Sequence, residues 1–123
     1  MEVIVREGSQ ITPDIILDPA GKIDIRGRSI HEDPSKFYDP LCKWIENYCQ
    51  EPAETTVVDI ELEYFNSGSA RYILKILKRL GLMMKDGHKL VVNWHYEEGD
   101  DDILERGEYY ASIMKINFNF IEC

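Results

Sequence analysis

The segment Asn66–Ser69 holds the side chains best placed to do chemistry, because one amide and two hydroxyls stand where a strand pattern ends and a helix pattern begins. At a helix start, Asn66 or Ser67 can accept a backbone N–H of the first helical turn, which contributes about 1 kcal/mol. A hydroxyl there can instead carry a phosphate, because free N–H groups and the positive end of the helix dipole accommodate it. Ser67 is therefore either a helix cap or a phosphorylation site, and the choice decides the function.

The charge of the chain determines what a phosphate at this turn would do. The 123 residues carry a formal net charge of -9, which repels phosphate backbones and anionic lipid. We therefore expect neither nucleic acid nor a membrane as partner, and a protein with a basic patch fits better. A phosphate on Ser67 would add up to about two negative charges close to Glu63. We expect it to repel a partner that docks over this helix start.

A strand pattern from Thr55 to Phe65 leads into the turn, and an amphipathic helix pattern from Gly68 to Met84 follows it. Successive side chains of a strand point to opposite faces of the sheet. One face of this strand receives the apolar side chains Ile60, Leu62 and Tyr64. The other receives the carboxylates Asp59, Glu61 and Glu63. Three unpaired carboxylates are too costly to bury, so we expect this sheet face to be open to water or to a partner.

The rest of the chain alternates strand and helix patterns. Strand patterns cover Val3–Arg6, Ile15–Leu17, Lys22–Arg26, Lys89–Tyr96 and Ile116–Ile121. Helix patterns cover roughly 35–50 and the segment after an acidic loop at 97–102. This order predicts one α/β domain over residues 1–123. Right-handed crossovers between parallel strands would place all three helices on one face of a single mixed sheet.

Two residues inside the helix patterns carry specific expectations. Pro40 would remove a hydrogen bond and clash with the preceding turn deep in a helix. We therefore expect Asp39 to cap the first helix with Pro40 at its first position, and residues 35–38 to form a separate turn. Gly107 stands within the apolar stripe of the third helix, which indicates close packing against another element.

No other group of residues forms a recognisable catalytic or cofactor site. His31, His88 and His95 are scattered, so we expect surface or strand-edge histidines and no metal site. The acidic run Glu97–Asp102 lacks the ligand spacing of a calcium loop, and its carboxylates suit the positive end of the helix that follows. We see no glycine-rich phosphate loop and no converging acid, base and nucleophile, so we expect no cofactor and no enzyme activity.

The N-terminal residues and the cysteines favour a cytoplasmic protein. The first residues lack the basic region and long apolar core of a signal peptide. No apolar run approaches the ~20 residues of a spanning helix. Three cysteines, without a C-x-x-C pair, indicate reduced thiols.

The order of motifs resembles the SiaC-like regulatory phosphoprotein family of bacteria over nearly the whole chain. The matching segments are Thr12–Ile15, Ile25–Ser29, Trp44–Glu46, Leu62–Ser69 and Asn93–Tyr96. The most specific are the tyrosine–aromatic–asparagine–hydroxyl turn and the Trp-His-Tyr strand end. This chain has serine where threonine is usual, and Gly68 replaces a hydroxyl residue.

The resemblance implies a fold similar to the anti-sigma factor antagonist (STAS-like) domains and a partner-switching role. A serine/threonine kinase of the anti-sigma type would phosphorylate the hydroxyl that maps onto Ser67, with Ser69 as second choice. A metal-dependent phosphatase would remove the phosphate. The unmodified protein would bind and activate an effector, in the SiaC-like branch a diguanylate cyclase. The expected partner-binding residues are Glu63, Asn66, Ser67, Ser69 and Arg71.

Two further hypotheses compete with this one. The chain could be a constitutive binding or dimerisation module in which Ser67 only caps the helix and the polar sheet face or the aromatics make the contact. An enzyme is a third hypothesis, which would need a polar pocket with converging reactive groups.

Overall fold

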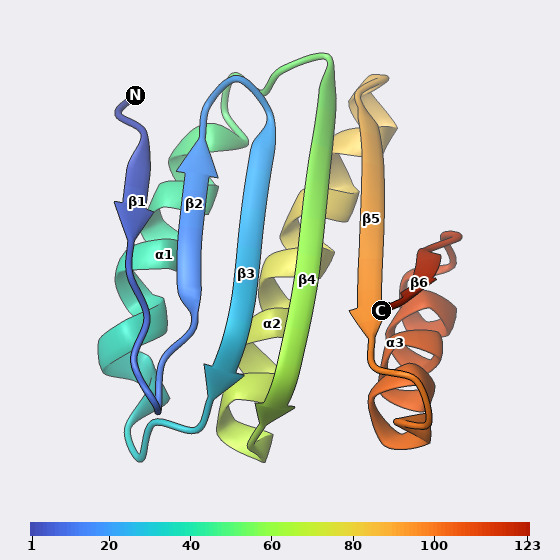
Figure 1. The fold of residues 1–123 in the computed structure, drawn as a ribbon. Coiled ribbons are helices and arrows are strands. Elements are labelled where there is room, and N and C mark those ends of the chain that lie inside the picture. The colour runs from blue at the N-terminus through green and yellow to red at the C-terminus, as the bar shows by residue number, and fades with distance from the viewer.

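The three connections between parallel strands each carry a helix, and this connectivity determines the architecture. The computed structural model describes residues 1–123 and contains one six-stranded mixed sheet with three α-helices on one of its faces (Figure 1). The strands are β1 (Ile4–Arg6), β2 (Asp14–Asp18), β3 (Lys22–Ser29), β4 (Thr55–Phe65), β5 (Lys89–Tyr96) and β6 (Asn119–Glu122). The helices are α1 (Pro34–Tyr48), α2 (Ser67–Gly81) and α3 (Asp101–Met114), with a 3₁₀ segment η1 (Leu82–Asp86) after α2.

Strand order in the sheet follows the order of the chain, from β1 at one edge to β6 at the other. The first three strands pair antiparallel, and β3 to β6 pair parallel. The predicted single mixed sheet with three helices is therefore confirmed, as are the full extents of β4 and β5. No helix of the chain combines the length and the apolar character that crossing a membrane requires.

The core is one cluster of 24 buried apolar residues between the sheet and the helices. Trp94 on β5 is its largest fully buried side chain. The Trp94 indole N–H donates to the carbonyl of Ile103 on α3 at 2.9 Å. Its ring lies edge-on to Tyr110, with 5.6 Å between centroids, and stacks on Phe118. Trp94 thus fixes α3 against β5.

The expected start of α1 is wrong. The helix begins at Pro34, with Asp33 before it, and Pro40 lies inside the helix. This start places Tyr38 on the buried face, where its hydroxyl pairs with Ser29 Oγ at 2.5 Å. Burial raises the pKa of Tyr38 to about 12, so the hydroxyl stays protonated. Proline at the first helical position is favourable, and Pro40 is exposed, where water can reach the backbone carbonyl that its missing N–H leaves free.

The strict alternation of β4 breaks near its end. The register with β3 shifts between Gly27 and Arg28, so that Glu63 is left over in the pairing. Tyr64 consequently points outward and is 57% exposed, whereas Phe65 is buried. The expectation that Tyr64 shares the buried face of Ile60 is therefore wrong.

Other element ends also differ from the prediction by one or more residues. β3 continues to Ser29 through Gly27, whose positive φ of 118° permits the shift in register. The helix after the turn ends at Gly81, before the expected Met84, and the 3₁₀ segment η1 that follows buries Met83. β6 begins at Asn119 and not at Ile116.

Gly107 provides a test of the α3 packing. A Cβ atom at this position would lie 2.5 Å from two atoms of the Trp94 ring, so the close packing predicted from the sequence is confirmed. We expect Gly107→Ala to lower the free energy of unfolding by about 1–3 kcal/mol through overpacking, measured by urea denaturation. Gly81→Ala is the matched control, because its Cβ would meet only the flexible end of Met114 at 3.2 Å. That control should be neutral or stabilising, and an equal loss in both variants would contradict the packing argument.

Candidate functional site

Asn66 caps α2 and leaves the hydroxyl of Ser67 free. The Asn66 Oδ1 atom accepts the backbone N–H of Ser69 at 2.9 Å. At the other end of the same amide, Nδ2 donates to the carbonyl of His31 at 3.2 Å. The backbone N–H of Asn66 donates to the backbone carbonyl of Ser29 at 3.1 Å. The cap is thus fastened to the loop that leads into α1, and the choice between Asn66 and Ser67 is settled in favour of Asn66.

Ser67 is the first residue of α2, and its side chain is exposed. The N–H groups of a first helical turn have no intrahelical acceptor and carry the positive end of the dipole. A phosphate on the Ser67 hydroxyl would therefore meet hydrogen-bond donors at its own helix end. The residue has the position and the exposure that a kinase substrate requires.

Ser69, the second candidate at the turn, lies on the opposite side of the helix. Its side chain is 0% exposed, and its Oγ has no hydrogen-bond partner. A kinase or a partner cannot reach this atom while α2 is folded. The expectation that Ser69 contributes a second phosphorylation site or a docking contact is therefore wrong for the folded protein, because residues 67 and 69 face different sides of the first turn.

Packing explains why glycine occupies position 68, which the sequence did not reveal. A Cβ atom here would lie 2.9 Å from Cγ of Pro34, the first residue of α1. The starts of α1 and α2 therefore approach closely at this point. Glycine at position 68 permits this close contact. It also leaves the turn without a hydroxyl at this position.

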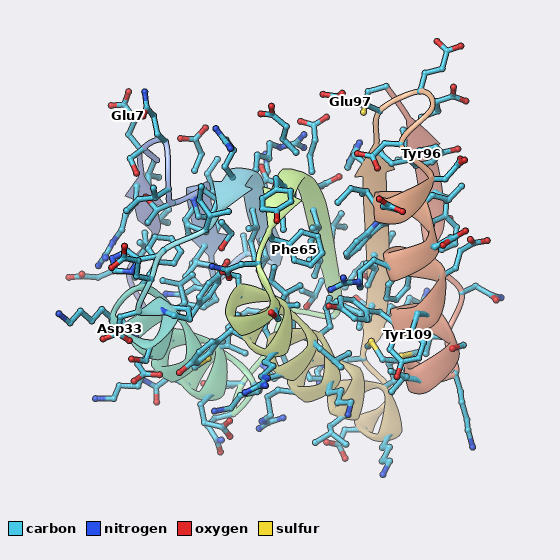
Figure 2. The ribbon with its side chains drawn as sticks, turned by 90° about the horizontal axis from the view of Figure 1, so that it is seen from below. Glu7, Asp33, Phe65, Tyr96, Glu97 and Tyr109 are labelled. Carbon is cyan, nitrogen blue, oxygen red and sulfur yellow. The ribbon has the colours of Figure 1, made fainter.

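A groove of about 710 Å³ runs beside Ser67, between the end of β4 and the first turns of α3. It is lined by Glu63, Tyr64, Phe65, Asn66, Ser67, Asp100, Asp102, Ile103, Glu105, Arg106 and Tyr109. Figure 2 labels Phe65 at the end of β4 and Tyr109 on α3, which belong to its two walls. The groove thus contains three of the predicted partner-binding residues. Arg71 is exposed on α2 but does not line the groove.

The groove is acidic, with two exposed aromatic rings. Four of its lining residues are carboxylates, and its one cation, Arg106, lies over the ring of Phe65 at 5.3 Å from the centroid. Tyr64 and Tyr109 are 57% and 60% exposed. Exposed aromatic residues of this kind are common anchors of protein interfaces. The arrangement suits a protein surface better than a small-molecule substrate.

Sequence reasoning missed Tyr64, Arg106 and Tyr109. The alternation of β4 places Tyr64 on the core side, and only the pairing with β3 reveals the register shift. Arg106 and Tyr109 flank Gly107 and Tyr110 on α3, so the helical spacing that buries Gly107 and Tyr110 turns them outward. This helical spacing is the sequence signal that could have identified Arg106 and Tyr109 as exposed residues.

The acidic run before α3 has a structural role. Asp100 caps the helix, and its Oδ1 accepts the backbone N–H of Ile103 at 3.1 Å. Asp101 and Asp102 lie in the first turn, where carboxylates favour the positive end of the dipole. The interpretation of this run as a helix start is confirmed.

Two of the three carboxylates expected on the open face of the sheet, Asp59 and Glu61, are paired. Arg26 on β3 contacts Glu61 at 3.0 Å and lies 3.9 Å from Asp59. His95 Nε2 and Asn93 Nδ2 both contact Asp59 Oδ1, at 2.9 and 3.1 Å. Burial opposes ionisation of Asp59, but the bonds from His95 and Asn93 lower its pKa below the usual value. The face uncovered by helices is thus an ordered polar network.

Comparison with known families identifies a match along nearly the whole chain. The model of the family described as SiaC family regulatory phosphoprotein matches residues 6–123. An uncharacterized protein of Pseudomonas aeruginosa is 26% identical over 112 residues, which cover 90% of this chain and 89% of that relative.

Solved structures of SiaC from Pseudomonas aeruginosa have the same fold as this chain. The crystal structure of apo-SiaC from Pseudomonas aeruginosa matches with a TM-score of 0.85 and 24% identity, covering 99% of this chain and 98% of that one. The crystal structure of the diguanylate cyclase SiaD in complex with its activator SiaC, from the same bacterium, contains a chain with a TM-score of 0.89 and 23% identity. The match covers 98% of this chain and 99% of that chain.

The cap geometry separates the roles of Asn66 and Ser67 experimentally. We expect Asn66→Ala to lower the free energy of unfolding by about 0.5–2 kcal/mol through loss of the cap. Ser67→Ala should stay within about 0.5 kcal/mol of the wild type, because the exposed hydroxyl makes no bond that is lost. Asn66→Asp keeps the capping oxygen but loses the donor to the His31 carbonyl, so its comparison with Asn66→Ala separates the contribution of the cap from that of the second bond. A larger loss for Ser67→Ala than for Asn66→Ala in urea denaturation would contradict this assignment.

Proposed function

The chain belongs to the SiaC family of regulatory phosphoproteins, and from this premise we propose that it is a non-enzymatic partner-switching regulator controlled at Ser67. The observation that carries the proposal is the exposed Ser67 hydroxyl at the start of α2, left free because Asn66 supplies the cap. A serine/threonine kinase of the anti-sigma type adds the phosphate, and a metal-dependent phosphatase removes it. The kinase reaches the Ser67 hydroxyl, and the phosphatase reaches the phosphate on it, without unfolding of the helix.

The unmodified protein binds an effector over the groove beside Ser67. The relative SiaC of Pseudomonas aeruginosa is an activator in complex with the diguanylate cyclase SiaD, and we propose a diguanylate cyclase as the effector here. Tyr64 and Tyr109 supply apolar contact area, and the carboxylates of Glu63 and Glu105 suit a partner with a basic patch. Binding would thereby couple this protein to cyclic di-GMP signalling in the cytoplasm.

Phosphorylation releases the effector, because the phosphate occupies the docking surface and must lose its water when the partner packs against it. A phosphate adds up to about two negative charges at the rim of a groove whose lining already includes four carboxylates and only one cation. The potential that attracts a basic partner becomes stronger, but the phosphate also occupies the docking surface and must be desolvated against it. At the helix start the phosphate is already satisfied by backbone donors, so desolvation and steric exclusion outweigh attraction when the partner packs closely.

The arrangement of sheet and helices supports a comparison with the anti-sigma factor antagonist domains. A sheet with helices on one face and a phosphorylatable hydroxyl at a helix start is the arrangement expected of the anti-sigma factor antagonist domains. We propose that the fold is similar to that of these STAS-like domains and that the switching mechanism is shared with them.

The first prediction concerns the modification itself. After incubation with ATP and the anti-sigma-type kinase of the same organism, we expect one phosphate per chain, mapped to Ser67 by peptide mass spectrometry. Ser67→Ala should remain unmodified. Ser35→Ala is the matched control, since Ser35 lies in the first turn of α1 but its hydroxyl donates to Asp33. Phosphate on other residues with Ser67 untouched would refute the assignment.

The second prediction concerns the effector. Ser67→Ala should bind the cyclase within about threefold of the wild type, whereas the phosphorylated protein and Ser67→Asp should bind at least about tenfold more weakly, a change of about 1.4 kcal/mol. Calorimetry with the purified cyclase measures both. Equal affinities of all forms, with binding lost in Tyr109→Ala, would support the constitutive binding module in place of the switch.

A further inference from the structure

Three potential metal-binding side chains converge at the open face of the sheet, away from the helices. One ligand atom each from Glu61, His95 and Cys123 lies within 4.8 Å of the other two. The residues come from β4, from β5 and from the segment after β6, so only the folded sheet brings them together. All three line a depression of about 300 Å³.

The sheet positions each of these residues. Glu61 and His95 are direct partners in the parallel pairing of β4 with β5. The backbone N–H of Cys123 donates to the carbonyl of Tyr96 at 2.8 Å, which brings the thiol to the end of β5. Cys123 Sγ then donates to Glu61 Oε1 at 3.3 Å. Figure 2 labels Tyr96 and Glu97 beside this corner of the molecule.

His95 has the outer partner that metal-bound histidines usually have. Asp59 Oδ1 lies 2.9 Å from His95 Nε2. A carboxylate on one ring nitrogen orients the imidazole and makes the other nitrogen a better ligand. Asn93 also donates to the same carboxylate oxygen at 3.1 Å, so Asp59 itself is held in place.

We propose that Glu61, His95 and Cys123 form a three-ligand site for a zinc-type divalent cation, with a fourth position open to water or to a side chain of a partner. A thiolate, an imidazole and a carboxylate are the ligand types of zinc, whereas calcium and magnesium take oxygen ligands. In a tetrahedral site, zinc bonds of about 2.0–2.3 Å place two ligand atoms ~3.3–3.8 Å apart. Ligand atoms that lie within 4.8 Å of one another must therefore approach by up to about 1 Å through side-chain rotation when the cation binds.

Arg26 is the group that opposes a cation here. Its guanidinium contacts Glu61 Oε2 at 3.0 Å, but Oε1, the oxygen beside Cys123, stays available. Asp24 lies 3.8 Å from the same guanidinium and offsets its charge. The sequence had argued against a metal because the three histidines are scattered, whereas this donor set uses only one of them.

The test uses metal ions alone and is independent of the proposed switch. We expect the reduced full-length protein to bind one Co²⁺ with a thiolate charge-transfer band in the near ultraviolet, and Zn²⁺ to displace it. Cys123→Ser and His95→Gln should abolish the band. Asp59→Asn should weaken Zn²⁺ binding by about 10- to 100-fold in calorimetry.

Matched controls separate this site from other metal binding. Cys49→Ser removes a half-buried thiol at the C-cap of α1 and should leave the Co²⁺ spectrum unchanged. Thermal unfolding without metal should be alike for the wild type and Cys123→Ser, because Cys123 is exposed. Absence of one-to-one binding, or a thiolate band that persists in Cys123→Ser, would overturn the proposal, whereas phosphorylation at Ser67 would be unaffected by either result.

Discussion

The two-ended hydrogen bonding of Asn66 is the interaction on which the functional turn depends. One end of the amide closes the first turn of α2, and the other holds the loop before α1. A serine at the cap would satisfy the helix but could not also reach His31 with a second polar group. Because the Asn66 amide makes both bonds, the Ser67 hydroxyl is not needed to cap the helix. Ser67 can therefore be modified without loss of the bond that starts the helix.

The groove beside Ser67 exists because α3 is held close to β5 and α2. The Trp94 ring occupies the space that a side chain at Gly107 would need. The Tyr110 hydroxyl donates to the carbonyl of Ala70 at 3.3 Å, which joins α3 to the first turns of α2. These contacts bury one side of α3 and turn Arg106 and Tyr109 toward the groove. The docking surface is thus a by-product of how the third helix packs.

The regular parts of the fold could be predicted from the sequence, and the irregular parts could not. Alternation over eleven residues determines β4, and the pattern of β5 is equally clear, so both were predicted to the residue. The outward turn of Tyr64 depends on a register shift against β3, which is a property of two strands. The burial of Ser69 depends on which residue caps α2, and a one-residue difference there rotates every side chain of the turn. Pro40 is tolerated inside α1 because it is exposed, so water can reach the carbonyl that its missing N–H leaves free.

The order of strands in the sheet has a consequence for how the chain folds. Each strand pairs with the one that precedes it in sequence, so each pairing closes a single connection, either a loop between antiparallel strands or one helical crossover between parallel strands. The sheet can grow in one direction as the chain is synthesised, with each crossover helix covering the apolar face that the new strand adds. Its two outer strands, of three and four residues, are too short to template edge-to-edge association with another chain. The connectivity that sets the architecture therefore also limits exposure to aggregation during synthesis.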